Sequence, residues 1–127
     1  MTRSGRSLWV FGIYVLIVAA GLLLIPNQLL GLLGFAETNE IWVRVVGIPL
    51  ILLGVYYFLA GRNDLSQFIR WSVPARASVI LFYFILVLTG AVNPIILIFG
   101  LADFLGAAWT ALSLRADQAE ITQDNLI

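Results

Sequence analysis

The sequence predicts an all-α membrane protein, in which a four-transmembrane-helix bundle is joined by short interfacial helices. Of the 127 residues, 61% are hydrophobic and only 11% are charged, whereas soluble domains are about half apolar and a quarter charged. The apolar residues fall into four runs, each close to the roughly 20 residues that a helix needs to cross a bilayer. None of the runs has the alternating pattern of barrel strands. We therefore expect a single transmembrane domain over residues 1–127.

The first apolar run covers residues 8–25 and follows a basic N-terminus, an arrangement that resembles a signal peptide. The run is longer than the apolar core of a typical signal peptide. It is followed by Pro26 and Asn27 rather than by a cleavage site of small residues. We interpret it as a retained membrane helix.

The other three runs cover residues 41–60, 77–92 and 94–114. The second carries Arg44 and Pro49, and the fourth carries Asp103. Asn93 and Pro94 form a turn signal between the third and fourth runs, so these two helices should be antiparallel neighbours. The polar residues 116–127 are predicted to form a flexible tail.

Two connections have the pattern of short helices at the membrane surface. Residues 27–35 place leucines, including Leu33, on one side, as expected for a helix on the outer surface. Residues 65–71 have a similar pattern on the inner side, with Asp64 as the expected N-terminal cap. Tryptophans near the predicted helix ends fit the role of interface anchors. These are Trp9, Trp42 and Trp71.

The arginines predict the orientation. Six of the seven basic residues lie before the first run, between the second and third, or after the fourth. Only Arg44 lies on the opposite side. The excess of basic residues on cytoplasmic loops places both termini in the cytoplasm of a bacterial inner membrane. We interpret Arg62, Arg70 and Arg76 as topology signals that also attract anionic headgroups.

Arg44 and Asp103 are the two charges inside the predicted spans, and a charge within a bilayer is a candidate functional site. Each has a structural explanation: Arg44 could extend to the headgroups, and Asp103 could be protonated and bonded to a hydroxyl. An uncompensated buried charge is costly, and each of these residues is the obvious partner of the other. We expect a direct or water-bridged Arg44–Asp103 contact.

Small residues mark the predicted helix-packing faces. After Arg44, three glycines recur seven residues apart, at Gly47, Gly54 and Gly61. In the last run, Gly100 and Gly106 flank Asp103. Tyrosines within the spans either pack or complete a polar pocket. The ligand-binding candidates are Arg44, Asp103, Tyr56, Tyr57 and Trp109, and Tyr14 and Tyr83 supply further hydroxyls.

Two stretches carry a family resemblance. The first is Ile41-Trp42-Val43-Arg44-Val45-Val46-Gly47, which continues through Tyr56-Tyr57 to Arg70-Trp71. The second is Phe99-Gly100-Leu101-Ala102-Asp103-Phe104-Leu105-Gly106-Ala107-Ala108-Trp109-Thr110. Together they resemble small bacterial four-helix inner-membrane proteins that are loosely DoxX-like. The resemblance implies a recurring polar and aromatic set at Arg44, Tyr56, Tyr57, Arg70, Asp103 and Trp109. It also implies a redox association, since DoxX proteins accompany thiosulfate:quinone oxidoreductase as a membrane subunit.

Three functions remain open from the sequence. The chain lacks Cys and His and has zero net charge, so neither a Cys/His metal site nor nucleic-acid binding is expected. No catalytic residues and no cofactor are predicted. The first hypothesis is a non-enzymatic subunit or scaffold, with a membrane protein or a second copy as its partner. The second is a binding protein or enzyme for a quinone or isoprenoid-like lipid at Arg44 and Asp103. The third is an oligomeric channel or transporter.

Overall fold

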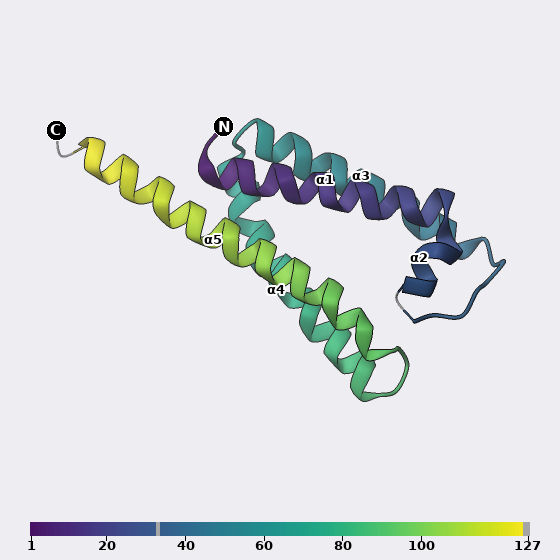
Figure 1. Ribbon diagram of the computed structural model, residues 1–127. Helices are drawn as coiled ribbons and strands as arrows, with labels where there is room; N and C mark the ends of the chain where they lie inside the picture. The colour runs from purple at the N-terminus through teal and green to yellow at the C-terminus, as the bar shows by residue number, and fades with distance from the viewer. Residues whose placement is uncertain (33, 126–127) are drawn as a thin grey trace.

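The computed structural model describes residues 1–32 and 34–125, and the helices account for most of them (Figure 1). No strand is present in these two ranges. The elements are α1 (Arg3–Leu24), α2 (Pro26–Leu32), α3 (Trp42–Arg62), α4 (Ser66–Leu88), the short 3-10 helix η1 (Pro94–Ile96) and α5 (Leu97–Asn125).

Four of the described helical segments are long and apolar enough to cross a membrane. They are α1, α3, α4 and the stretch Pro94–Asn125, which joins η1 to α5. This confirms the predicted all-helical class and the four candidate spans. Only helices and closed barrels satisfy their backbone polar groups within lipid, so these segments are suited to a multi-pass membrane protein.

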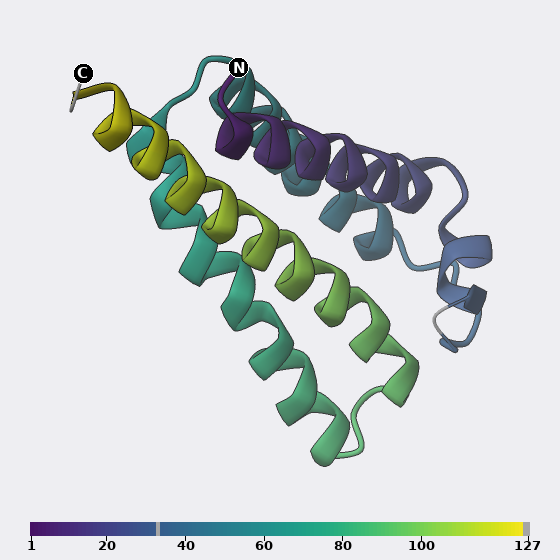
Figure 2. The same cartoon turned by 60° about the vertical axis from the view of Figure 1, so that its left-hand side comes forward.

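The long helices form two antiparallel hairpins, α1 with α3 and α4 with α5, which meet mainly through α1 and α5. Figures 1 and 2 show that the hairpins converge near the N-terminus and diverge towards α2 and the α4–α5 turn. The helices are therefore in the order α3–α1–α5–α4. Because α3 packs mainly on α1 and α4 mainly on α5, this is a more open arrangement than a square bundle.

Helix α4 differs from the sequence prediction at its start. A short surface helix over residues 65–71 and a separate span from residue 77 were expected, but Ser66–Leu88 is one continuous helix that includes Pro74. Pro74 cannot donate to the carbonyl of Arg70, and Arg70 lies on an exposed face, so this loss is tolerated. Asp64 does not cap the helix through its side chain. Its carboxylate accepts hydrogen bonds from Thr2 instead.

The two ends of the chain also differ from the prediction. Helix α1 begins at Arg3 because Thr2 caps it, with the Thr2 side chain accepting a hydrogen bond from the Gly5 N–H. Helix α5 does not end near residue 114 but continues to Asn125, through the expected flexible tail. The added residues include two Ala, two Gln and one Glu, which favour helix, and contain no Gly or Pro. Residues 126–127 and Leu33 lie outside the described residues. The short helix expected over residues 27–35 is α2, which covers Pro26–Leu32.

Glycines on α3 allow close approach to α1. A Cβ built on Gly61 would lie 2.5 Å from both the Gly5 carbonyl oxygen and the Trp9 nitrogen. One built on Gly54 would lie 3.2 Å from the Leu16 nitrogen, and one on Gly47 would lie 3.2 Å from the Ala19 carbonyl oxygen. These neighbours are backbone atoms that cannot rotate away, so the α1–α3 hairpin requires small residues along this face.

Replacing Gly61 with alanine should therefore destabilise the protein by about 1–3 kcal/mol, because the new methyl group would overpack the α1–α3 contact. Thermal unfolding in detergent micelles measures this effect. The matched control is Gly31→Ala in α2, where an added Cβ meets nothing within 4 Å. Equal melting temperatures for the two variants would contradict the close packing of α3 on α1.

Candidate functional site

Arg76 lies at the centre of the most polar region between the hairpins. Only 2% of its surface is exposed, which contradicts its interpretation as a basic residue facing the headgroups. Arg62 and Arg70 are exposed, as expected for that role. Arg76 lies ten residues after the start of α4, or about 15 Å along the helix. A guanidinium at this depth has to be satisfied by the protein or by bound molecules.

The guanidinium of Arg76 joins α4 to α5. Its Nη2 donates to Thr110 Oγ1 at 2.7 Å and lies 3.4 Å from Ser72 Oγ, and its Nε lies 3.4 Å from the Ser72 carbonyl oxygen. Nη1 is buried and has no hydrogen-bond acceptor among the described residues. The hydrogen-bonding capacity of this buried cation is therefore only partly used.

A chain of hydroxyl groups extends this contact to α1. The Thr110 and Ser7 hydroxyls lie 2.7 Å apart, and Ser7 Oγ donates to the Ser4 carbonyl at 2.7 Å. Ser7 and Thr110 are both fully buried. One polar layer therefore contains side chains from α1, α4 and α5, and we call Ser7, Arg76 and Thr110 the inner triad.

Asp117 closes the same seam towards the chain termini. Ser4 Oγ donates to Asp117 Oδ2 at 2.6 Å, and the backbone N–H groups of Ser4 and Arg3 donate to the same carboxylate. These three hydrogen bonds stabilise the negative charge of the Asp117 carboxylate. Asp117 thereby fixes the end of α1 to α5.

Aromatic rings cover the guanidinium on its other side. The Cζ of Arg76 lies 4.7 Å from the centroid of the Phe11 ring and 6.0 Å from that of Tyr57. These distances allow a cation–π interaction, which gains strength away from water. Gly106 makes room for the layer, because a Cβ there would lie 2.9 Å from the Phe11 ring and 3.6 Å from Nη1.

Asp103 lies two helical turns from Thr110 on α5, where it lines a cavity of about 100 Å³. Tyr14 and Tyr83 line the same cavity, and its remaining walls are apolar: Val15, Val18, Leu50 and Phe99. In the described ranges, neither the Asp103 carboxylate nor these two tyrosine hydroxyls bonds to another protein group. We call Tyr14, Tyr83 and Asp103 the outer triad.

The predicted Arg44–Asp103 contact is not present among the described residues. Arg44 is exposed, and its Nη1 donates to the Leu23 carbonyl oxygen at 2.9 Å. That carbonyl belongs to the last turn of α1, where helices leave acceptors unsatisfied and favour a positive charge. Arg44 therefore completes the end of α1.

The other ligand-binding candidates lie apart from this cavity. Tyr56 and Trp109 are exposed. Tyr57 is buried, and its ring packs against Phe11 and Phe68 next to Arg76. On the packing faces of α5, Gly100 lies against Tyr83 and Ile80, and Gly106 lies against Phe11.

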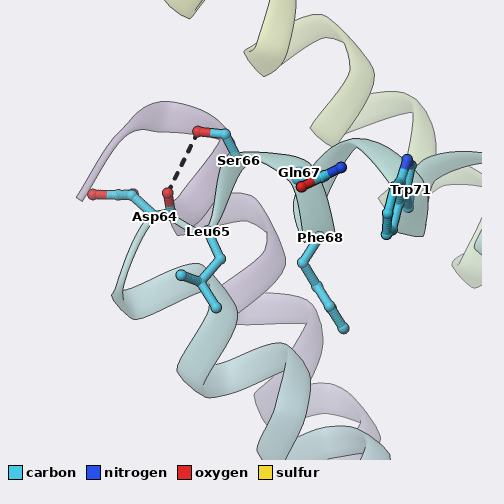
Figure 3. A pocket seen from close by; sticks show the side chains of 6 residues that line it. All are labelled: Asp64, Leu65, Ser66, Gln67, Phe68 and Trp71. Carbon is cyan, nitrogen blue, oxygen red and sulfur yellow. Dashed lines mark hydrogen bonds between the residues drawn. The ribbon is translucent and has the colours of Figure 1, made fainter.

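A larger hollow of about 470 Å³ lies at the α3–α4 corner. Figure 3 shows Asp64 and Trp71 at its two ends, with Gln67 and Phe68 between them. The Asp64 carboxylate is engaged by Thr2 and lies 3.9 Å from the N-terminal amine. No buried polar group of the described residues faces this hollow without a partner, so it gives less indication of a site than the cavity at Asp103.

The sequence contains a signal for both triads, although the residues of the inner triad were not among the predicted site residues. On three helices, the residue of the outer triad lies seven positions from one of the inner triad: Ser7 and Tyr14, Arg76 and Tyr83, Asp103 and Thr110. Seven residues are two helical turns, so the two residues of each pair share a face. The predicted span began only at residue 77, which left Arg76 outside it and concealed the pair on α4.

Comparisons of this chain with protein-family models, with curated proteins and with solved structures returned no match. Among the described residues, no group of three or more His, Cys, Asp or Glu side chains is placed to hold a metal ion. The interpretation of the site therefore depends on its own geometry.

Removing the Thr110 hydroxyl should destabilise the protein, because it takes a hydrogen-bond acceptor from a buried guanidinium. We expect Thr110→Val to reduce stability by about 1–3 kcal/mol. Thr89→Val is the control, since the exposed Thr89 hydroxyl donates to the Leu86 carbonyl in the adjacent turn of α4, and it should change stability by less than about 0.5 kcal/mol. Thermal unfolding in micelles compares them, and an unaffected Thr110→Val variant would be evidence against the polar layer.

Proposed function

We propose that this chain is a non-enzymatic subunit or scaffold of a membrane complex in the bacterial inner membrane, with both termini in the cytoplasm. The orientation is supported by the basic residues. The hydrogen bonds of Thr2 to Asp64 and of Ser4 to Asp117 bring the N-terminus, the α3–α4 corner and the C-terminal part of α5 together at one end of the molecule. The exposed arginines Arg3, Arg6, Arg62, Arg70 and Arg115 flank this end.

The observation that carries the proposal is the incomplete packing of α3 and α4. Each has one long helix as its main neighbour, and an apolar hollow of about 200 Å³ lies between them. The hollow is lined by Leu53, Tyr57, Phe68, Trp71, Ser72 and Ala75. Its aromatic and small side chains are suited to contact with a further transmembrane helix. We propose that a helix of a partner protein packs here.

The resemblance to DoxX-like proteins is compatible with a role as a membrane subunit and remains a proposal. Two of the residues that carry the resemblance, Arg44 and Asp103, have different roles in this fold. Arg44 completes the end of α1, whereas Asp103 lines the cavity between the hairpins. A membrane subunit needs no catalytic residues of its own.

Site-specific photo-cross-linking tests the proposed contact in native membranes. A photoreactive residue replacing Trp71, which lines the hollow, should give a protein adduct of one reproducible mass. The same residue replacing Ile17 on α1 should give lipid adducts only; the two positions are equally exposed, at 68%. Native mass spectrometry of the complex in mild detergent should show the same partner in a fixed ratio.

An adduct of two copies of this chain would replace the partner protein with a homo-oligomer. Lipid adducts alone at both positions, together with a monomer in native mass spectrometry, would overturn the subunit proposal.

A further inference from the structure

We propose that the cavity at Asp103 binds the hydroxyl head of a neutral, single-chain lipid alcohol. This cavity shares no lining residue with the hollow of about 200 Å³ between α3 and α4, and the inference does not depend on the subunit role. The observation that carries it is the outer triad itself: three polar side chains line one cavity and have no hydrogen-bond partner among the described residues.

The register of the helices makes the outer triad a counterpart of the inner one. Thr110 contacts Ser7 of α1 and Arg76 of α4. Because α5 is antiparallel to both helices, a step of seven residues along each of the three brings Tyr14, Tyr83 and Asp103 to a common level. The cavity lining confirms that the three residues surround one space.

The two levels differ in how their polar groups are satisfied. At the inner level the hairpins converge, and the side chains bond directly to one another at 2.7 Å. At the outer level the hairpins diverge (Figure 2), and a cavity of about 100 Å³ lies among groups that have no protein partner in the described part of the chain. A carboxylate left without hydrogen bonds in an apolar setting is costly, so a bound molecule would stabilise this level.

The charges favour a neutral ligand. Arg76 and Asp103 have opposite formal charges, so together they add no net charge to this region. A phosphate or carboxylate head would be attracted by the guanidinium but repelled by Asp103, which is the charged group that lines the cavity itself. A neutral group avoids this repulsion. A hydroxyl is neutral and can donate one hydrogen bond to Asp103 while it accepts one from a tyrosine hydroxyl of the cavity.

The size and walls of the cavity favour a lipid alcohol over a larger head. About 100 Å³ holds roughly three water molecules at about 30 Å³ each, or one small head group. Val15, Val18, Leu50 and Phe99 provide apolar contacts for the first methylene groups of a chain. Water alone would satisfy the carboxylate but would leave these apolar walls in contact with water, which is unfavourable.

Photolabelling of the purified, full-length chain in nanodiscs tests the proposal. The probe is hexadecanol carrying a diazirine and an alkyne, and the matched probe is its methyl ether, which cannot donate to Asp103. We expect saturable labelling around the cavity that unlabelled hexadecanol displaces. The ether should label about tenfold less, since a hydrogen bond to a charged group is lost.

Two variants locate the site. Asp103→Asn should reduce labelling by the alcohol about tenfold, and Tyr83→Phe should reduce it about threefold. Tyr56→Phe is the control, because Tyr56 is exposed on α3 and does not line the cavity, so its labelling should be unchanged. If Asp103→Asn fails to fold, the comparison of alcohol and ether on the unaltered chain decides the question.

Three results would overturn the inference. Equal or non-saturable labelling by alcohol and ether would show contact with bulk lipid only. Stronger labelling by the corresponding fatty acid would indicate an anionic-lipid site. The absence of cavity labelling by any probe would leave water as the only occupant. None of these results bears on the cross-linking at Trp71, so the two proposals can fail separately.

Discussion

The burial of the Arg76 guanidinium is the constraint on which the arrangement of the helices depends. A cation inside a membrane helix has to be neutralised or hydrogen-bonded within the protein. Here Thr110 and Ser72 supply oxygen atoms, while Phe11 and Tyr57 present aromatic faces. These contacts come from α1, α3, α4 and α5. The two hairpins are therefore joined at one polar layer, although most of their surfaces diverge from there.

This layer also explains why the molecule changes character along its length. Near the termini, Ser4 and Asp117 continue the seam and hold α1 against α5. Two helical turns from the inner triad, away from the termini, the same faces of α1, α4 and α5 carry Tyr14, Tyr83 and Asp103. The hairpins have separated at this level, and a cavity lies among these side chains instead of direct hydrogen bonds. The repeated seven-residue spacing therefore yields a structural contact at one level and a candidate ligand site at the next.

Much of the fold could be predicted from the sequence because it depends on composition and on the length of apolar runs. The four spans, the helix after Pro26 and the turn at Pro94 follow from such local signals. The partners of the charged residues did not follow, because they depend on which helices become neighbours. Arg44 donates a hydrogen bond to the Leu23 carbonyl at the end of α1. Helix α4 continues through Pro74, and Arg76 is therefore buried within this helix rather than exposed before it.

Nitrogen-15 NMR of the arginine side chains in nanodiscs tests the buried guanidinium most directly. Of the seven arginines, one should show side-chain N–H protons that exchange slowly with water, and Arg76→Lys should remove that signal. The slow exchange follows from burial and from the hydrogen bond to Thr110. If all seven side chains exchanged at the rates of exposed arginines, Arg76 would face water or headgroups, and the proposed polar layer between the hairpins would be contradicted.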